Sequence, residues 1–465
     1  PTATPTPTPT VTPTPTATPT PTATPTPNAS PTPLPNSVVQ FSSSLYAVQE
    51  DCTQVVAQVV RSGVTTGRVT VDVNSNDGTA KQKGDYTYVV GRLVFEPGET
   101  QKALPILISE DAYAEGPESF TLSLSNPTGG ATLAGAITAT VQIADDNAEQ
   151  NSNPIDDSRT FVCQHYHDFL YRHPDQAGED FWTQGIESCG SGEQCRQERR
   201  VDTSTAFFLS IEFQNTGYFV IRVRKAAFGN DKSNPRYAIF LRDQRTISEG
   251  VVIGTPGSGE RLEQNRQRYL EDLVSSPEYT AAFPQGMQRG QYVNKLFANA
   301  GVTPTTAERD EARDAYGTGD TAGRAAALRS VAESDSVFLA QYNPAFVLMQ
   351  YFGYLRRNPD DPPDNNFLGY DFWLAKMNSF SLPNENVRNE TVALQRVRRA
   401  EMVRAFIESI EYRNRFHGAP GGNQQGSQAQ SQPPAVSDAG RKWREELARA
   451  LSLAFEPAFR AGLRL

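Results

Sequence analysis

Long apolar runs and histidine are scarce in this sequence. No apolar run reaches the roughly 18–20 residues that a helix needs to cross a bilayer, so we expect no transmembrane segment. Only four of the 465 residues are histidine, which leaves little material for a Ser/His triad. The sequence also contains no Walker loop, no Gly-x-Ser-x-Gly elbow and no His-Glu-x-x-His helix. We therefore expect a protein that is not an enzyme.

An excess of basic residues is also missing. The chain has 43 basic and 53 acidic residues, for a formal net charge of −10. A general nucleic-acid binder needs a basic face to neutralise phosphates, so no nucleic acid is expected as a partner. The sequence shows neither a starting methionine nor a signal peptide. We expect either that a signal was removed or that the chain is a fragment.

Cysteine is sparse, with Cys52, Cys163, Cys189 and Cys195 as its only instances. Cys189 and Cys195 flank a short loop that contains glycine. In an exported chain such a loop can close into a disulfide, and the alternative is a pair of unlinked thiols. A zinc site is not expected, because no second Cys or His pair has ligand spacing.

The first 36 residues are almost entirely proline and threonine. This composition cannot bury a core, and proline favours the extended polyproline II conformation. At about 3.1 Å per residue, we expect a disordered stalk on the order of 100 Å long. Such stalks separate modules on secreted proteins and can carry O-linked sugars. A plain linker is the alternative.

Residues 37–148 alternate apolar and polar positions in short runs. Examples are Val69-Val71-Val73 and Phe120-Leu122-Leu124, with turns such as Asn76-Asp77-Gly78 between the runs. Period-two strands at this spacing are typical of an antiparallel β-sandwich. The segment has the length of one such domain.

Ordered motifs along this segment resemble those of the Calx-β domain family. The resemblance implies an immunoglobulin-like sandwich over residues 37–148. The motifs that carry it are Asn76-Asp77-Gly78-Thr79-Ala80, Gly84-Asp85-Tyr86, Phe95-Glu96-Pro97-Gly98-Glu99-Thr100, Glu115-Gly116-Pro117-Glu118-Ser119-Phe120, Leu124-Ser125-Asn126-Pro127 and Ile143-Ala144-Asp145-Asp146.

The same resemblance implies a Ca²⁺ site built from acids at the strand ends. Two positions depart from the family pattern, because Asn147 replaces the last acid of the closing triplet and Glu110 replaces an aspartate. The acids implied as ligands are Glu50, Asp77, Glu110, Asp111, Glu115, Glu118, Asp145 and Asp146.

Calcium would have a physical role at such a site. Ca²⁺ takes six to eight oxygen ligands, several of them carboxylates. Acids that converge at one end of a sandwich repel each other, and a divalent ion would relieve that repulsion and crosslink the loops. An ion that binds only the folded state stabilises it. The alternative is that these acids form a solvated rim, as charged loop residues usually do.

Residues 149–417 lose the period of two and gain helical periodicity, for example over Arg261–Val274 and Arg396–Tyr412. An internal repeat is visible in this region. One strong copy runs from Tyr166 to Trp182 and the other from Tyr351 to Trp373. Helical stretches follow them at 206–213 and 405–412, and weaker copies lie at 223–279 and 296–338. We therefore expect an α-helical domain of four related units.

The strong copies share the order Tyr, apolar pair, Arg, Pro-Asp, Phe-Trp and then Ser-Ile-Glu-aromatic. This pattern resembles the bacterial domain-of-unknown-function family 4214, which is related to phycobilisome linker domains. The resemblance covers about residues 160–416. It implies a helical module on exported proteins and no known reaction.

Four side chains of the repeats are of types that can bind ligands. His165 and His167 would point to different faces of a helix, and the second copy has no histidine there, so we expect a structural role. Trp182 and Trp373 could stack on sugars, but their recurrence in the repeat favours core packing. Exposure of these two tryptophans would favour a carbohydrate-binding function.

Beyond the helical region, residues 418–439 are a Gly/Gln/Ser/Pro linker. Residues 440–465 are expected to form a short helix with Trp443, Leu447, Leu451 and Phe455 on one face.

Together these features predict a multidomain all-β plus all-α protein, secreted or on the cell surface, with Ca²⁺ as its ligand. We expect adhesion, matrix or assembly interactions with a cell-surface protein or a polysaccharide. A carbohydrate-binding array is the alternative, and an enzyme with its site among the helices ranks below both.

Overall fold

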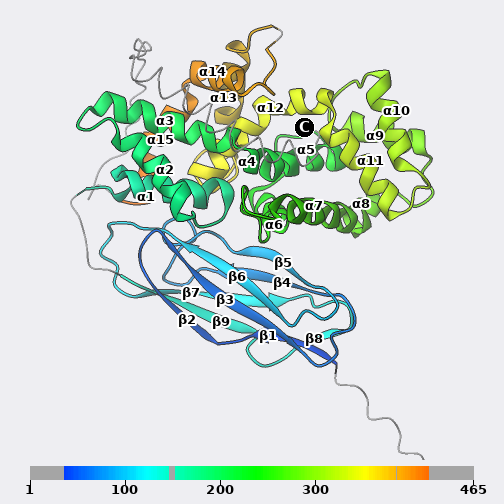
Figure 1. Cartoon of the computed structure of the whole chain (residues 1–465), viewed down its shortest axis with the longest axis horizontal. Helices are drawn as coiled ribbons and strands as arrows, with labels where there is room; N and C mark the ends of the chain where they lie inside the picture. The colour runs from blue at the N-terminus through cyan, green and yellow to red at the C-terminus, as the bar shows by residue number, and fades with distance from the viewer. Residues whose placement is uncertain (1–35, 146–151, 384, 418–465) are drawn as a thin grey trace, which may run out of the picture. The chain divides into compact units, whose positions relative to one another are not determined.

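The computed structural model describes residues 36–145, 152–383 and 385–417. Figure 1 shows strands in the N-terminal part of this range and helices in the rest. The predicted Pro/Thr stalk up to residue 35, Asp146, Asn147, the 418–439 linker and the 440–465 helix lie outside the described residues. Within the described part of the chain, no helix combines the length and apolarity needed to cross a membrane.

The β-region is a sandwich of a four-stranded sheet, in the order β6-β3-β1-β8, and a five-stranded sheet, in the order β2-β9-β7-β4-β5. The strands are β1 (Ser37–Phe41), β2 (Leu45–Gln49), β3 (Thr53–Ser62), β4 (Val69–Asn76), β5 (Val90–Phe95), β6 (Gln101–Ile108), β7 (Glu118–Ser125), β8 (Ala131–Leu133) and β9 (Thr138–Ala144).

The predicted alternation places side chains on two faces of the strands. In β4, Val69, Val71 and Val73 are buried between the sheets. Phe120 of β7 is also buried and stacks on Tyr86, with ring centroids 3.7 Å apart. Because side chains alternate along a strand, these buried positions form the core of the sandwich.

The sequence predicted an antiparallel sandwich, but two of its strand pairs are parallel. β1 pairs in parallel with β8, and β2 pairs in parallel with β9. The chain passes from one sheet to the other between β1 and β2, at residues 42–44. These first strands were not predicted, because each is only five residues long and carries little periodic signal.

Helices make up the described chain from residue 154 onward. They are α1 (Ser158–His165), α2 (Gln176–Glu187), α3 (Glu193–Leu209), α4 (Ile211–Asn215), α5 (Gly217–Phe228), α6 (Tyr237–Ser248), α7 (Ser258–Ser275), α8 (Pro277–Ala282), α9 (Arg289–Asn299), α10 (Thr306–Tyr316), α11 (Thr321–Glu333), α12 (Asp335–Met349), α13 (Leu368–Ser379), α14 (Glu390–Ala400), α15 (Met402–Ile407) and α16 (Ile410–Arg413), with the short η1 (Pro154–Asp156) and the π-helices η2 (Tyr166–Leu170) and η3 (Gln350–Tyr354).

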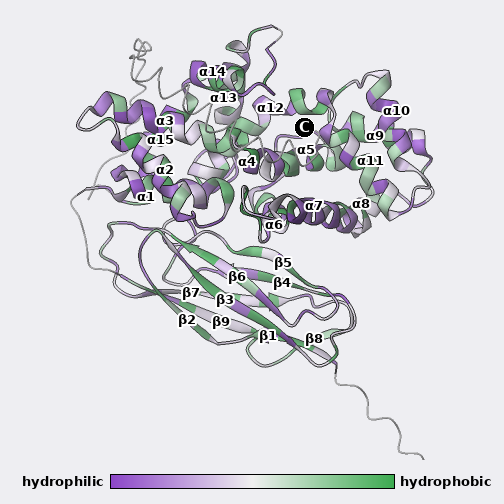
Figure 2. Cartoon of the chain, in the orientation of Figure 1, coloured by the Kyte–Doolittle hydropathy of each residue, from purple (hydrophilic) through white to green (hydrophobic). Residues whose placement is uncertain are grey.

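The predicted helix at 261–274 corresponds to α7. It buries Leu262, Leu270 and Leu273 on one face. The rest of the helix is rich in Glu, Gln and Arg, and it is mostly purple in Figure 2. A single apolar stripe of this kind is typical of a helix that covers a core.

A serine cap recurs in all four predicted helical units. Ser210 Oγ accepts a hydrogen bond from the N–H three residues later, at 3.1 Å, and Ser409 Oγ does the same at 3.2 Å. Ser276 and Ser334 in the weaker copies make the equivalent contacts at 3.2 and 3.4 Å. Serine favours the N-cap because its oxygen satisfies a free backbone N–H. Each serine therefore caps the start of a new helix.

These caps correct the prediction that 206–213 and 396–412 are each a continuous helix. α3 ends at Leu209, and Ser210 begins α4. The second stretch is divided into three helices, first at Glu401, which has a φ of 52°, and then at Ser409. Apolar periodicity does not register such breaks, because a new helix can keep its apolar face toward the same core.

The two strong copies make matching contacts. Arg172 donates to both carboxylate oxygens of Glu212, at 2.7 and 2.9 Å, and Arg357 donates to both of Glu411, at 2.6 and 2.9 Å. Each arginine also lies over the tyrosine that opens its copy, at 4.8 and 5.4 Å from the ring centroids. The Arg of the Pro-Asp loop therefore joins that loop to the Ser-Ile-Glu helix.

The repeated tryptophans are partly buried against the helical core. Trp182 contacts Phe207 with ring centroids 5.7 Å apart, and Trp373 contacts Phe406 at 5.8 Å. His165 is fully buried, and its Nδ1 lies 2.7 Å from the carbonyl oxygen of Phe161. His165 therefore belongs to the core, and its burial lowers its pKa to about 4.

Candidate metal centre

Acidic side chains gather where several strands of the sandwich end. Glu50 follows β2, and Asp145 follows β9, which is the parallel partner of β2. Glu110 and Asp111 follow β6, and the loop from there leads to Glu118 at the start of β7. Because neighbouring strands end side by side, carboxylates that are distant in sequence reach the same place.

The tightest group within this cluster contains Asp85, Glu115 and Glu118. One carboxylate oxygen from each lies within 4.8 Å of the others. The N–H of Gly116 donates to Asp145 Oδ2 at 2.9 Å, which brings Asp145 to the same loop. Oxygens that converge in this way from separate loops can share one cation.

Burial and like charge act together on Glu50 and Asp111. Burial raises the pKa of Glu50 to about 9, and the charges of Asp111 and Glu110 add to the shift. Burial also raises the pKa of Asp111 to about 8, with Asp85 and Glu115 adding to it. The Tyr113 N–H, 2.9 Å from Asp111 Oδ1, opposes this shift without cancelling it.

Asp85 and Glu118 form a carboxyl–carboxylate pair. Burial raises the pKa of Glu118 to about 8, and a hydrogen bond to Asp85 raises it further toward that value. Burial also raises the pKa of Asp85. Two carboxyl groups in contact cannot both ionise easily, so they share a proton.

The charged groups that shift Glu50, Asp111 and Glu118 most are all acids. In the part of the chain described, the nearest charged neighbours of these three groups therefore disfavour their ionised forms, which a cation would favour. A hard divalent cation with oxygen ligands fits this donor set.

Two predicted ligands have other surroundings. Asp77 is exposed, and its Oδ1 accepts hydrogen bonds from Tyr86 Oη at 2.6 Å and from the Gln82 N–H at 3.1 Å. It therefore holds the loop from 77 to 86, next to the cluster but outside its tightest group. Glu110 is half-buried and adds negative charge to Glu50 and Asp111. Asp146 lies outside the described residues.

Asp85 is the ligand candidate that the sequence analysis missed. It stands in the Gly84-Asp85-Tyr86 motif, and the Lys81 N–H donates to its Oδ2 at 2.5 Å. One feature of the sequence could have indicated Asp85: it directly precedes an aromatic residue, Tyr86. Tyr86 is fully buried in the core of the sandwich.

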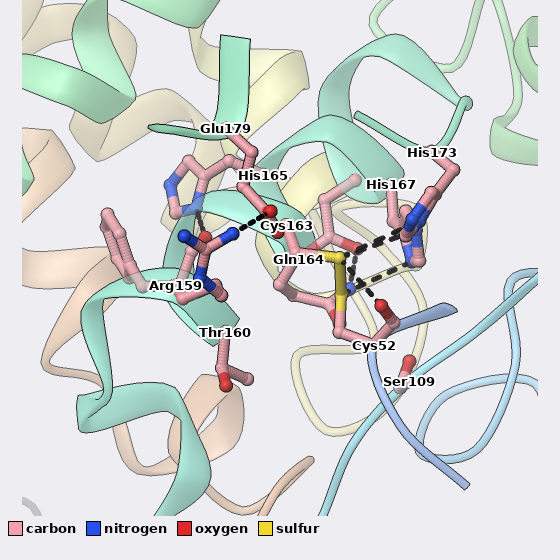
Figure 3. Close-up of a disulfide and its surroundings, with 12 residues drawn as sticks. Cys52, Ser109, Arg159, Thr160, Cys163, Gln164, His165, His167, His173 and Glu179 are labelled. Atoms are coloured by element: carbon pink, nitrogen blue, oxygen red, sulfur yellow. Dashed lines mark hydrogen bonds and ion pairs between the residues drawn. A yellow bond between two sulfur atoms is a disulfide. The ribbon is translucent and has the colours of Figure 1, made fainter. Parts of the chain in front are cut away.

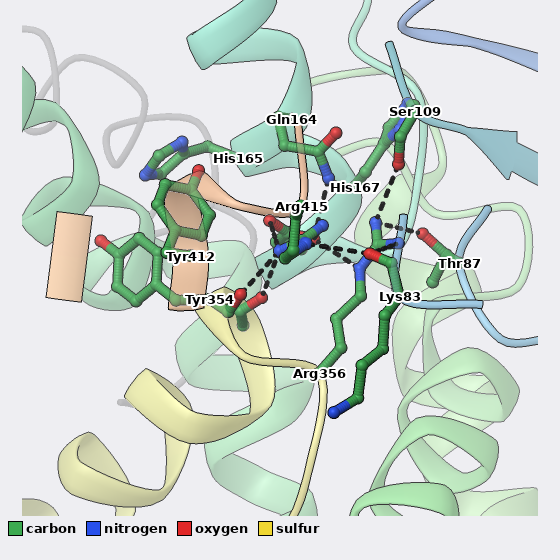
Figure 4. Close-up of polar contacts among 12 residues, drawn as sticks. Lys83, Thr87, Ser109, Gln164, His165, His167, Tyr354, Arg356, Tyr412 and Arg415 are labelled. Carbon is green, nitrogen blue, oxygen red and sulfur yellow. Dashed lines mark hydrogen bonds and ion pairs between the residues drawn. The ribbon is translucent and has the colours of Figure 1, made fainter. Parts of the chain in front are cut away.

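The segment that carries Asp85 is held by an arginine of the helical region (Figure 4). Arg356 donates to the carbonyl oxygen of Tyr86 at 2.9 Å and to Thr87 Oγ1 at 3.0 Å. It also donates to Asp168 Oδ1 at 3.1 Å. The loop of the sandwich and helical residue Asp168 therefore share one guanidinium group.

Arg415 completes this buried ion cluster. It donates to Asp168 Oδ2 at 3.0 Å, to the Tyr354 carbonyl at 2.7 Å and to the Lys83 carbonyl at 3.0 Å. Burial alone would raise the pKa of Asp168, but Arg415 and Arg356 lower it below its usual value. Asp168 is therefore a compensated buried anion.

The segment that carries Asp111 also contacts the helical region. The Ala112 N–H donates to the Phe416 carbonyl at 2.8 Å, and Tyr113 Oη donates to the Asn414 carbonyl at 2.7 Å. Together with the Arg356 and Arg415 contacts, these bonds form what we call the seam, the set of contacts between segments 81–87 and 109–113 and the helical region.

Two disulfides are present among the described residues. Cys189 and Cys195 are bonded to each other, in the pairing that the short loop suggested. Cys52 is bonded to Cys163, 111 residues away, and joins the sandwich to the helical region (Figure 3). The sequence did not reveal this pair, because no local spacing relates two cysteines so far apart.

Comparison with known proteins agrees with the sandwich. Residues 35–147 match the Calx-beta domain family. Sodium/calcium exchanger 1 of Canis lupus familiaris is 39% identical over 93 residues, which cover 20% of this chain and 10% of that protein. Sodium/calcium exchanger 2 of Homo sapiens is 38% identical over 127 residues, covering 24% of this chain and 14% of that protein.

Among solved structures, the apo-form Calx CBD1 domain is 33% identical, with a TM-score of 0.24 over 24% of this chain and 99% of that domain. The matched segment spans only about a tenth of the curated exchangers. Residues 35–147 are a Calx-beta domain, followed by a helical region.

Proposed function

We propose that the Calx-beta domain binds Ca²⁺ through the acidic cluster at the ends of β2, β6 and β9. The observation that carries this proposal is the convergence of carboxylates from separate segments, with oxygens of Asp85, Glu115 and Glu118 within 4.8 Å of one another. Burial and like charge also raise the pKa values of the neighbouring carboxyls. The proposed ligands are Glu50, Asp85, Glu110, Asp111, Glu115, Glu118 and Asp145, with Asp146 as a ligand from the sequence alone.

The similarity to sodium/calcium exchangers supports this ligand. It supports nothing about transport, because the match covers only a small part of those proteins. What the Calx-beta resemblance implies is a regulatory or structural calcium module. The ion would replace shared protons and crosslink loops that otherwise repel each other.

We further propose that Ca²⁺ stiffens the seam. Asp85 lies within segment 81–87 and Asp111 within segment 109–113, both of which contact the helical region. Glu50 lies two residues before Cys52, which is bonded to Cys163. An ion that fixes these segments also fixes the surface on which the helices rest.

The proposed setting is the cell surface or extracellular matrix, with adhesion or assembly as the role of the whole chain. The two disulfides support an exported location, because disulfides persist in oxidising compartments. The recurrent serine caps support four related helical units, which offer a repeated surface to a protein or polysaccharide. No catalytic role is proposed.

The carbohydrate-binding alternative depended on free tryptophan faces. Trp182 and Trp373 instead pack against Phe207 and Phe406. This packing favours the assembly role over an array of sugar-binding tryptophans.

The test is calcium titration of the full chain by isothermal calorimetry, together with thermal melting in Ca²⁺, Mg²⁺ and excess chelator. At 100 times Kd, Ca²⁺ should stabilise the fold by about 2.7 kcal/mol. Asp111→Asn and Glu118→Gln should each weaken Ca²⁺ binding at least tenfold.

Asp310→Asn is the matched control, because it removes one charge from an exposed position on α10. It should leave the affinity unchanged. Equal affinity in Asp111→Asn and Asp310→Asn, or no heat of binding at millimolar Ca²⁺, would show that the acids are a solvated rim.

A further inference from the structure

A second cluster of metal-ligating side chains lies at the disulfide that joins the two regions (Figure 3). Cys163 Sγ is 3.8 Å from His167 Nε2 and 3.9 Å from His173 Nδ1. The two histidine nitrogens are 3.2 Å apart. Cys52 Sγ lies 3.9 Å from His167 Nδ1. Two cysteines and two histidines therefore meet at one point, two residues beyond Glu50.

These groups come from three separate segments. Cys52 belongs to the sandwich, Cys163 and His167 lie one turn apart on α1 and η2, and His173 lies in the Pro-Asp loop that follows. Cys52, Cys163 and His167 are buried, while His173 is half-buried and forms the edge of the cluster. The absence of a zinc site was predicted from sequence spacing, and that spacing cannot register a set assembled across 111 residues.

The imidazoles are in the form that binds metals. Burial, with the neighbouring imidazole of His173, lowers the pKa of His167 well below its usual value. Burial also lowers the pKa of His173. Neutral imidazole nitrogens are ligands at neutral pH.

The spacing of the nitrogens and of Cys163 Sγ fits tetrahedral zinc. Zn–N bonds of about 2.0–2.1 Å and Zn–S bonds of about 2.3 Å place two nitrogens about 3.3 Å apart, and a nitrogen and a sulfur about 3.6 Å apart. The observed separations are 3.2 Å for the nitrogens and 3.8 and 3.9 Å from Cys163 Sγ. Only Cys52 Sγ has to move, and reduction of the disulfide frees it to do so.

We propose that, when the Cys52–Cys163 disulfide is reduced, Cys52, Cys163, His167 and His173 bind one Zn²⁺. A dithiol supplies the two electrons and two protons that convert the disulfide into two thiols, and becomes a disulfide itself. On binding Zn²⁺, each thiol releases its proton to solvent, so two thiolates and two neutral imidazoles surround the ion. With four protein ligands the site is closed, as structural zinc sites are.

The disulfide of the oxidised chain and the zinc of the reduced chain would both link the sandwich to the helical region. In the oxidised chain a covalent bond joins Cys52 to Cys163, and in the reduced chain zinc would join Cys52 to the three helical ligands. The sandwich would therefore stay attached to the helical region before and after oxidation. This site goes beyond the proposed calcium function, since its donors are sulfur and nitrogen.

The test uses the full chain, reduced anaerobically with a dithiol, incubated with zinc sulfate and desalted into buffer without Ca²⁺. Zinc per chain is measured by mass spectrometry, and Co²⁺ replaces zinc for absorption spectra. The reduced chain should retain one zinc and show a thiolate-to-cobalt charge-transfer band. The oxidised chain should retain none.

Three variants separate this site from other binding. The double variant Cys189→Ser with Cys195→Ser removes the other pair of thiols and should retain zinc. The double variant Cys52→Ser with Cys163→Ser should lose it. His173→Gln leaves the buried residues and the disulfide in place and should weaken zinc binding at least tenfold, with far-UV circular dichroism as the check of folding.

Zinc binding that is equal in the reduced wild type and in the Cys52→Ser, Cys163→Ser chain would overturn the proposal. So would a His173→Gln chain that folds and binds zinc with unchanged affinity. Glu118→Gln should leave zinc binding unchanged, so a failed calcium site and a failed zinc site give different results.

Discussion

The acidic cluster of the sandwich and the ion cluster of the seam both contain buried carboxyl groups, yet the charged neighbours of these groups are of opposite sign. Asp168 has two arginines on its carboxylate, and its pKa is lowered despite complete burial. Glu50 and Asp111 have mainly acids as charged neighbours, and their pKa values are raised. A buried charge is tolerated when it is paired. Asp168 therefore has its countercharges within the protein, whereas the charged neighbours of Glu50 and Asp111 mainly add like charge.

The largest predicted effect comes from unbalancing the seam. Asp168→Asn keeps the shape of the side chain but leaves Arg356 and Arg415 buried without their carboxylate. Removing one partner of a buried ion pair costs about 3–5 kcal/mol, so we expect a loss of this size in the free energy of unfolding. Urea denaturation of the full chain measures it.

The exposed Asp310→Asn variant is again the control, and it should change stability by less than about 0.5 kcal/mol. If Asp168→Asn lost no more stability than Asp310→Asn, the seam would not be a balanced ion cluster. The ion pairs of Asp168 would then not distinguish the seam from the acidic cluster in stability.

An effect that is smaller per pH unit should appear in the pH dependence of the chain without Ca²⁺. An acid whose pKa is raised on folding binds more protons in the folded state than in the unfolded state. Stability must then fall as pH rises, from the unfolded pKa near 4 toward the folded values of about 8 and 9 for Asp111 and Glu50. Each excess proton contributes a slope of about 1.4 kcal/mol per pH unit, reduced in practice by solvent screening at the half-buried Glu50.

Melting temperatures at pH 7.0, 7.5 and 8.0, in chelator and in saturating Ca²⁺, would measure this slope, because in that range the histidines whose pKa values burial lowers are largely neutral in both the folded and the unfolded chain. In chelator the melting temperature should fall over this range. In Ca²⁺ the decrease should shrink or reverse, because the ion takes the place of the protons and affinity rises with pH. A melting temperature that rises with pH in chelator would contradict the unbalanced state of the cluster.

The sequence allowed the sandwich and most of its acids to be predicted. Strand alternation such as that of Val69, Val71 and Val73 is set by side-chain direction in a single strand. Acids at strand ends, such as Asp111 and Asp145, were identified as candidate ligands by the resemblance to Calx-β domains. Asp85 was missed because its contact with Glu118, the first residue of β7, joins parts of the chain that are distant in sequence.

The seam could not be predicted, because it depends on a departure from the repeat. Arg357 repeats the role of Arg172. One residue earlier, Arg356 stands where the first copy has Tyr171, and both Arg356 and Tyr171 have a positive φ, of 48° and 53° respectively. At that position the side chain of Arg356 reaches the sandwich and Asp168. Nothing local in the sequence separates the arginine that repeats from the one that forms the seam.

The smallest predicted effect tests whether the two strong copies are energetically as well as geometrically alike. Arg172→Lys and Arg357→Lys each replace a two-pronged guanidinium contact to a glutamate by a point charge, and this is not a conservative change at such a site. We expect a loss of about 1 kcal/mol in each copy. Arg357 also contacts Asp364 Oδ2 at 2.8 Å, so its variant should lose slightly more. Urea denaturation of both variants would show the order, and a larger loss in Arg172→Lys would mean that the copies share contacts without sharing their energetic weight.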